Sequence, residues 1–156
     1  MRLYCMRHGE AEMDIVDSHR CLTCHGQSDI KRIGEYVAKL KISVNHIFHS
    51  GLLRAEQTAK IMADCLPGKV QPESMPGLED GSLVEPLADM IQHWQDDSLL
   101  VSHMPFISNL VSYLVTGQSH QAITAFPPGM LVMLERSRPG VWQLSLALSP
   151  SMVVSV

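Results

Sequence analysis

The chain has 156 residues, of which 46% are hydrophobic and 18% are charged. A chain of this length buries roughly 68–70% of its unfolded surface, so we expect a single domain over residues 1–156. The 16 acidic residues outnumber the 12 basic ones, and the net charge of -4 disfavours a nucleic-acid partner. No apolar run approaches the roughly 18 residues of a membrane helix, and early charges interrupt any secretory signal. The four sparse cysteines then predict reduced thiols in a cytoplasmic protein.

The first half of the chain predicts two strands, each followed by a helix. Leu3–Met6 is a short apolar run that predicts a buried strand, and polar residues 10–29 predict an irregular segment. The spacing of apolar residues by three and four then predicts a helix that carries Ile30, Ile33, Val37 and Leu40. A strand over His46–Ser50 and a helix over Leu52–Leu66, ended by Pro67-Gly68, complete this half.

The second half adds a further strand–helix pair and then changes to strands alone. A short strand over Val70–Ser74 and a loop over 75–82 precede a predicted helix that carries Leu87, Met90, Ile91 and Trp94. Ser98–Ser102 predicts a strand, followed by a helix that begins near Pro105 and ends at Gly117. The last predicted elements are two strands, 130–134 and 141–148, joined by a hairpin at 138–140.

Alternating strands and helices predict an α/β fold, a three-layer αβα sandwich around a mostly parallel central sheet. Right-handed crossovers bring the carboxyl ends of parallel strands to one edge, where ligands bind in such sheets. Three predicted strands end there in the polar residues His8, Ser50 and His103. We therefore expect the functional site at this edge.

Each polar motif at this edge also has a simpler interpretation when it is taken alone. Arg7-His8-Gly9 could be an ordinary polar strand end, and Arg54, in the first turn of a helix, could be a solvated surface arginine. Its alternative role is to bind an anion that the helix N-terminus already favours. His103, between a buried strand and a helix start, could equally be a capping residue.

Together the motifs form a pattern: R-H-G at 7–9, S-x-x-x-R-A-x-Q-T at 50–58 and S-H at 102–103. This order resembles the histidine phosphatase superfamily, which has the phosphoglycerate-mutase-like fold. The stretch 18–26 is similar to the R-x-L-T-x-x-G segment of the SixA-type phosphohistidine phosphatases. That branch has this chain length and lacks long insertions over the pocket, and the short stretch between Leu66 and Ser98 likewise leaves little material for a lid.

The resemblance implies a role for each matching residue. His8 would be the nucleophile and become transiently phosphorylated, while Arg7 and Arg54 would bind the phosphoryl oxygens. His103 would contact the same group and, held among oxyanions, tend to stay protonated. Two further residues are candidates for substrate binding: Arg20 as a third cation, and Ser50.

Larger members of the superfamily use an acidic proton donor after the third strand. Here Glu79 and Asp80 are the candidates, and the alternative is that both are surface loop carboxylates. A phosphohistidine substrate would reduce the need for an acid, because its leaving imidazole can carry its own proton. A weak acid therefore favours cleavage of a P–N bond over a P–O bond.

A metal site is the alternative that Cys21-x-x-Cys24-His25 raises, with His19 as a further ligand. One such pair is half of a structural zinc site, which normally has four ligands. We therefore expect neither a metal nor another cofactor.

We expect a metal-independent phosphatase whose substrate is phosphohistidine on a partner protein, such as a phosphorelay domain, and whose product is inorganic phosphate. Two alternatives remain open. One is a phosphatase of small phosphate monoesters on the same fold. The other is a catalytically silent module that binds phosphoproteins.

Overall fold

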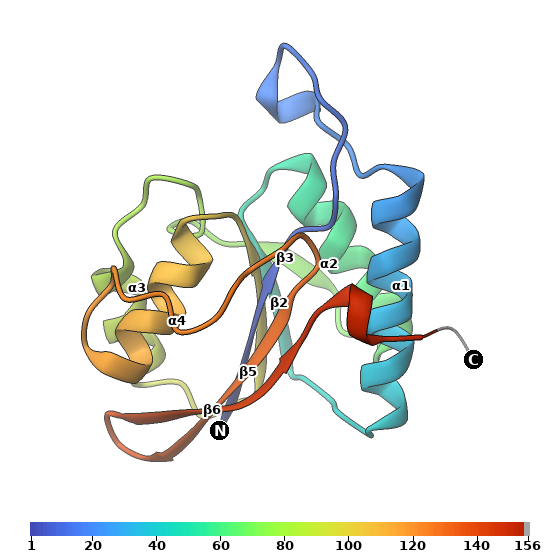
Figure 1. Cartoon of the computed structure of the whole chain (residues 1–156). Coiled ribbons are helices and arrows are strands. Elements are labelled where there is room, and N and C mark those ends of the chain that lie inside the picture. The colour runs from blue at the N-terminus through green and yellow to red at the C-terminus, as the bar shows by residue number, and fades with distance from the viewer. Residues whose placement is uncertain (155–156) are drawn as a thin grey trace.

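The computed structural model describes residues 1–154 and contains one six-stranded sheet with the strand order β3-β2-β4-β1-β5-β6 (Figure 1). Four neighbouring strands are parallel to one another: β1 (Arg2–Arg7), β2 (His46–His49), β3 (Pro72–Ser74) and β4 (Ser98–Ser102). The other two, β5 (Leu131–Arg138) and β6 (Val141–Leu148), form an antiparallel hairpin that extends the sheet beyond β1. The prediction of a mostly parallel central sheet is therefore confirmed.

Helices cover both faces of the sheet, which makes the three-layer sandwich (Figure 1). On one face lie α1 (Cys24–Lys39) and α2 (Leu53–Cys65), and on the other α3 (Val84–Ile91) and α4 (Phe106–Thr116). Successive side chains of β1 alternate between the two cores: Leu3 packs with α3 and α4, and Tyr4 packs with α1 and α2. Because a central strand of a parallel sheet is buried on both sides, it appears in the sequence as an unbroken apolar run.

The predicted irregular segment is too long, because α1 begins at Cys24 rather than near Ile30. Thr23 caps this helix: its side chain accepts a hydrogen bond from the Gly26 backbone N–H at 2.8 Å. A Cβ atom at Gly26 would lie 2.2 Å from the Glu10 carbonyl oxygen, so only glycine allows this close approach. The segment that leaves β1 is thus pinned to the first turn of α1.

Two smaller predictions also need correction. The helix α3 ends at Ile91, so Trp94 lies beyond it, and Met90 is exposed rather than part of the apolar face. The strand β3 begins at Pro72 and not at Val70. In contrast, α4 ends as predicted at Gly117, which adopts the left-handed conformation with φ of 78°.

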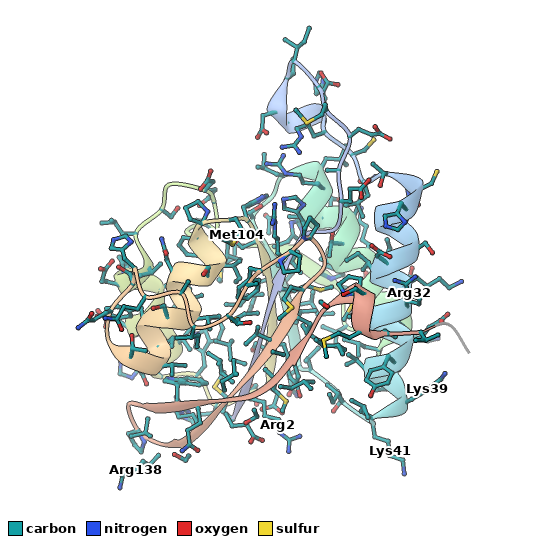
Figure 2. The ribbon with its side chains drawn as sticks, viewed as in Figure 1. Arg2, Arg32, Lys39, Lys41, Met104 and Arg138 are labelled. Carbon is teal, nitrogen blue, oxygen red and sulfur yellow. The ribbon has the colours of Figure 1, made fainter. Side chains whose placement is uncertain are left out.

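The topology places three strand ends together. Because β1 pairs in parallel with β4, and β4 with β2, their carboxyl ends meet at one edge of the sheet. The backbone confirms this contact, since the His8 N–H donates to the Ser102 carbonyl at 3.0 Å. Residues 10–23, which we call the finger, leave β1 at this edge and rise above it (Figure 1). Figure 2 shows Arg2 and Arg138 at the opposite end of the sheet.

Candidate active site

His8 is buried directly after β1, and hydrogen bonds fix both of its ring nitrogens. Its Nδ1 lies 2.7 Å from the Gly9 carbonyl oxygen, which can only accept a hydrogen, so Nδ1 carries the proton. Its Nε2 accepts a hydrogen bond of 3.3 Å from Nε of Arg54. The ring is therefore held as the tautomer whose Nε2 lone pair faces Arg54. That nitrogen is the atom able to act as a nucleophile.

Arg54 is buried in the first turn of α2, where the positive end of the helix also lies. Its Nη1 donates to the Asp17 carbonyl at 3.1 Å, and its Nη2 lies 3.3 Å from the Asp17 carboxylate. Thr58, one turn further along α2, donates to the Arg54 carbonyl and accepts from the Gly9 N–H at 3.1 Å. This threonine fixes the start of α2 against the loop that carries His8.

His103 lies beside His8, with the two ring centroids 5.0 Å apart. Its Nε2 shares a 2.5 Å hydrogen bond with the Ser50 hydroxyl, so Ser50 positions the ring. The buried Nδ1 of His103 has no hydrogen-bond partner among residues 1–154. An unsatisfied buried polar atom costs roughly 1–3 kcal/mol, and it is available to contact a ligand.

Arg7 presents a second unsatisfied atom. Its Nη1 donates to the Phe126 carbonyl at 2.8 Å, whereas its buried Nε has no partner within the described residues. Burial lowers the pKa of Arg7, and the charge of Arg20 lowers it further. The positive charge of Arg7 in turn lowers the pKa of His8. The edge therefore contains one cation, Arg7, with a buried donor that no side chain or backbone group of residues 1–154 satisfies.

The electrostatics of the two histidines are alike rather than opposite. Burial, with smaller effects from His103, Arg54 and Arg7, lowers the pKa of His8 to about 3. Burial, and then the charge of Arg54, lowers the pKa of His103 to about 4, although Asp80 and Asp17 act in the other direction. Among the protein's own side chains, burial and cations thus favour a neutral His103, whereas a protonated His103 among bound oxyanions stays a prediction. A bound phosphoryl dianion would raise the pKa of His103, because a negative charge nearby favours the protonated ring.

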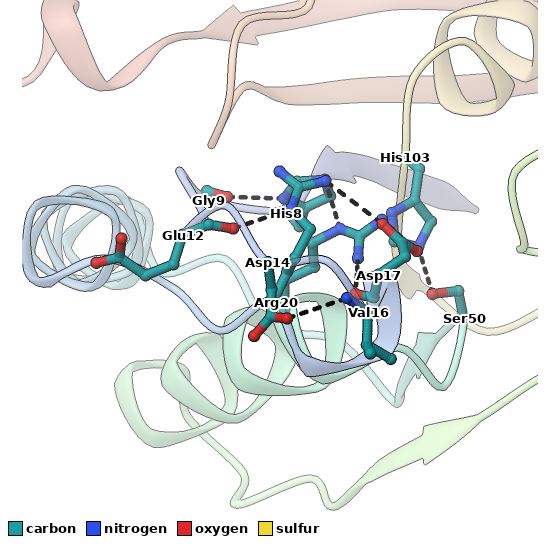
Figure 3. A network of polar contacts seen from close by, with 10 residues as sticks. His8, Gly9, Glu12, Asp14, Val16, Asp17, Arg20, Ser50 and His103 are labelled. Carbon is teal, nitrogen blue, oxygen red and sulfur yellow. Dashed lines mark hydrogen bonds and ion pairs between the residues drawn. The ribbon is translucent and has the colours of Figure 1, made fainter.

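Asp17 is the member of this cluster that the sequence did not reveal. Its carboxylate, on the 3₁₀ turn of the finger (Asp17–His19), contacts Arg54 and lies 3.5 Å from Nη1 of Arg20. Burial is the largest single effect on the pKa of Asp17 and raises it, but the charge and hydrogen bonds of Arg54, together with those of Arg20, hold this pKa below its usual value. Nε of Arg20 donates to the Glu12 carbonyl at 2.9 Å, which ties the two sides of the finger together (Figure 3).

The two candidate proton donors differ in their contacts. The Glu79 carboxylate accepts from the Gly77 N–H at 2.7 Å and from the Ser82 hydroxyl at 3.2 Å. Backbone hydrogen bonds lower the pKa of Glu79, so this residue stabilises its own loop as a carboxylate. Asp80 is exposed, and its charge raises the pKa of His103. The charge of His103 also lowers the pKa of Glu79, after the effects of its backbone hydrogen bonds, so both carboxylates interact with this histidine.

The cysteine motif provides no metal site in the part of the chain that the structure describes. No three His, Cys, Asp or Glu side chains within residues 1–154 are grouped so as to hold a metal ion. Cys24 is exposed at the start of α1, and His25 pairs with Asp29 at 3.3 Å instead. Nor does any helix within these residues combine the length and the apolar character needed to span a bilayer.

The site thus combines a histidine nucleophile with arginines and an unsatisfied histidine nitrogen, which suits transfer of an anionic group. A sequence profile of the histidine phosphatase superfamily (branch 1) matches residues 3–85. Phosphohistidine phosphatase SixA of Escherichia coli (strain K12) is 30% identical over 152 residues, covering 93% of this chain and 94% of that protein. The chain belongs to the histidine phosphatase superfamily.

Solved structures agree with this assignment. The protein histidine phosphatase SixA complexed with tungstate superimposes with a TM-score of 0.89 at 26% identity, over 99% of this chain and 100% of that one. A phosphoserine phosphatase from Entamoeba histolytica, in complex with 3-phosphoglyceric acid, has the same fold, with a TM-score of 0.73 at 16% identity over 98% and 99% of the two chains. As a member of the superfamily, this chain is a phosphatase with a histidine nucleophile.

Proposed function

We propose that this phosphatase removes phosphate from a phosphohistidine on a partner protein, such as a phosphorelay domain. The observation that carries the proposal is the tautomer of His8. Its Nδ1–H is bound to the Gly9 carbonyl and its Nε2 lone pair faces Arg54, while the buried Nε of Arg7 and Nδ1 of His103 have no hydrogen-bond partner among residues 1–154. The likeness to SixA over nearly the whole chain supports the same substrate class. The four free cysteines suit the reducing cytoplasm, where we place the enzyme.

In the first step, Nε2 of His8 forms a bond to phosphorus while the bond from phosphorus to the substrate nitrogen breaks. The electron pair of the broken bond stays on that nitrogen. The substrate leaves as a neutral imidazole when its other ring nitrogen carries a proton. Arg7, Arg54 and Nδ1 of His103 bind the phosphoryl oxygens, whose charge rises in the transition state.

In the second step, water attacks phosphorus and the bond to His8 breaks. Both hydrogens of the water remain with the released inorganic phosphate, and His8 recovers its Nε2 lone pair. The proton on Nδ1 stays on the ring throughout, because the Gly9 carbonyl holds it there. Splitting the displacement into two steps gives each a lower barrier than direct hydrolysis.

The properties of the two candidate proton donors, Glu79 and Asp80, also support a phosphohistidine substrate. Glu79 is engaged by its own loop, and Asp80 is exposed at the edge of the site. Both carboxylates are exposed, and the pKa of Glu79 is lowered, whereas a general acid near neutral pH is usually a buried carboxyl with a raised pKa. A leaving imidazole needs no such acid, whereas an alkoxide does.

Small phosphate monoesters are the second candidate substrate class. The observation in its favour is that the charge of Asp80 raises the pKa of His103, which supports this carboxyl as a candidate donor. If Asp80 were protonated in the enzyme–substrate complex, it would assist departure of an alkoxide. The phosphoserine phosphatase fold shows that this architecture accommodates such an enzyme.

The decisive experiment compares turnover of a histidine-phosphorylated phosphorelay domain with turnover of alkyl phosphate monoesters. We expect kcat/KM to be higher for the phosphoprotein by about 10²-fold or more, because the site lacks a strong acid. Rapid quenching should also trap a phosphoenzyme that is labile to acid and absent from the His8→Ala variant. Faster turnover of alkyl esters than of the phosphoprotein would contradict the proposal and favour the alternative.

A further inference from the structure

The finger carries a group of large apolar side chains that the fold leaves in solvent. Met13 is 86% exposed, Ile15 is fully exposed and Val16 is 46% exposed. Burying one such side chain contributes roughly 1.5–3 kcal/mol, so these three contribute little to the stability of the isolated fold. Three exposed apolar residues within four positions, on one projecting segment, mark an interaction surface.

The finger is ordered by polar contacts and not by packing of these side chains. Ala11 and Leu22 form an antiparallel bridge at its base, and the Glu12 N–H donates to the Cys21 carbonyl at 2.7 Å. At its tip, the Asp14 carboxylate accepts from the Val16 N–H at 3.0 Å. The apolar side chains therefore stand on a segment that is already held, which lowers the entropy lost when a partner binds.

The position of the finger relates this surface to the active site. Asp17, which follows Val16 directly, contacts the buried Arg54 of the pocket. A phosphorylated side chain that reaches His8 must bring the protein surface around it against the edge of the pocket, and the finger rises from this edge (Figure 1). The substrate protein is thus the molecule that must come close to these apolar side chains.

The charges on the finger specify the chemistry of that partner. Acidic residues alternate with the apolar ones: Glu10, Glu12, Asp14 and Asp17, of which Asp17 is already paired with Arg54 and Arg20. The Glu12 side chain is exposed beside Met13. A complementary surface would present apolar side chains bordered by Lys or Arg.

We propose that Met13, Ile15 and Val16 form the docking surface for the protein substrate. They bind an apolar patch, bordered by basic residues, next to its phosphorylated histidine. This inference rests on the proposed function, because it assumes that the phosphoryl group arrives on a protein. It assigns protein specificity to the finger and leaves the chemistry to the pocket beneath it.

The test compares two substrates that share the same P–N bond: a histidine-phosphorylated phosphorelay domain and free phosphohistidine. In the Ile15→Ser variant and the Met13→Ser, Ile15→Ser double variant, we expect kcat/KM for the protein to fall about tenfold or more, through KM. Turnover of free phosphohistidine should stay within about twofold of the unsubstituted enzyme. Met152→Ser is the matched control, because Met152 is 67% exposed on the short C-terminal 3₁₀ turn, and we expect no change for either substrate.

A charge variant tests the basic border of the partner. Glu12→Lys should lower kcat/KM for the protein several-fold, and the loss should shrink as salt is added, because salt screens exposed charges. The same variant should leave turnover of free phosphohistidine unchanged. An equal effect on both substrates would mean that the finger acts on the pocket, and it would overturn the docking role.

Other outcomes separate this inference from the proposed function. If the unsubstituted enzyme turned over neither phosphohistidine substrate, the proposed function itself would fail and the inference with it. If the unsubstituted enzyme turned over both substrates, and the finger variants had the same kcat/KM as this enzyme for each of them, the docking inference alone would fail. A dimer of the unsubstituted chain that Ile15→Ser dissociates would assign the surface to self-association and also overturn it.

Discussion

Arg54 donates from its Nε to Nε2 of His8 across 3.3 Å, so an arginine side chain points at the lone pair that must attack phosphorus. When a phosphoryl group enters, this donor can move from the histidine nitrogen to a phosphoryl oxygen without leaving the site. The buried guanidinium thus orients the nucleophile before the reaction and binds the developing charge during it. Lysine could not replace it, because a single ammonium cannot make these fixed, directed contacts.

The first prediction is that His8→Ala abolishes turnover while the protein stays folded. The change removes the attacking nitrogen, and we expect a loss of about 10³-fold or more. Turnover of free phosphohistidine measures the loss, and circular dichroism with a urea unfolding curve checks the fold. A folded His8→Ala variant with the activity of the unsubstituted enzyme would show that another residue is the nucleophile.

The second prediction concerns the stability of the fold at acidic pH. In the folded protein the pKa values of His8 and His103 are about 3 and about 4, whereas an unfolded histidine titrates near 6.5. Between these values the unfolded chain binds protons that the folded chain does not. Each histidine therefore contributes stability that is fully present above about pH 6.5 and is lost as the pH falls, by up to about 1.4 kcal/mol per pH unit.

Urea unfolding between pH 7 and pH 4 provides the measurement. We expect the His8→Gln variant to lose less stability than the unsubstituted protein over this range, because it lacks the titration of His8. His120→Gln, at an exposed position, is the control and should follow the unsubstituted protein. An identical pH dependence in His8→Gln would mean that His8 accepts a proton in the folded state.

The helices and strands that the sequence predicts best are those with local signals. The strands β1 and β4 are unbroken apolar runs, and α2 lies between a strand end and Pro67-Gly68, so their bounds lie within about two residues of the prediction. The start of α1 was missed because its signal is not hydrophobic. It depends on the Thr23 cap and on the contact of Gly26 with Glu10, which only the folded chain reveals.

The residues of the site differ in the same way, because some have a local sequence signal and others depend on contacts of the folded chain. His8, Ser50 and His103 could be predicted because each lies just beyond the carboxyl end of a parallel strand, where topology alone brings them together, and Arg54 was added by the motif that follows Ser50. Asp17 could not, because its place depends on how the finger folds back onto α2 across 37 positions of sequence. One sequence feature could have pointed to Asp17: it lies three residues before Arg20. In the structure these two residues form an ion pair.

The third prediction uses the Asp17–Arg54 contact. The Asp17 carboxylate lies on a cation that a phosphoryl group would bind, so it should repel that group and compete with it. We expect Asp17→Asn to tighten product inhibition by inorganic phosphate about fivefold, since one exposed charge about 4 Å away is worth about 1 kcal/mol. Asp14→Asn is the control on the same finger, because its side chain contacts the Val16 N–H instead. Weaker inhibition in Asp17→Asn would show that the carboxylate holds Arg54 in place for phosphate.

The fourth prediction is that activity survives exhaustive chelation. Phosphoryl transfer needs cations to balance the charge of the transition state, and some enzymes use magnesium for this purpose. Here Arg7 and Arg54 supply the positive charge. Turnover before and after dialysis against EDTA should agree. A strict requirement for a divalent metal would direct attention to Glu79 and Asp80, or to the Cys21–Cys24 pair.

The last prediction separates the two substrate classes through the Glu79→Gln, Asp80→Asn double variant. With phosphohistidine the leaving imidazole carries its own proton, so kcat/KM should change little. An activated aryl phosphate should behave similarly, because its leaving group is stable as an anion. Alkyl phosphate esters should lose far more if either carboxyl protonates their alkoxide, since general acid catalysis contributes roughly 10²–10⁴-fold.

The discriminating measurement is kcat/KM for all three substrates in this variant and in each single variant. Because Glu79 is engaged by Gly77 and Ser82, its single substitution should act mainly on the loop, and any loss specific to alkyl esters should follow Asp80→Asn. A uniform loss above about 10²-fold would mean that these carboxylates do something other than protonate a leaving group. A loss confined to alkyl esters, in an enzyme that turned them over rapidly beforehand, would instead favour the small-ester function. Since a proton on the leaving group is what distinguishes P–O from P–N cleavage, the behaviour of Asp80→Asn decides between the two substrate classes.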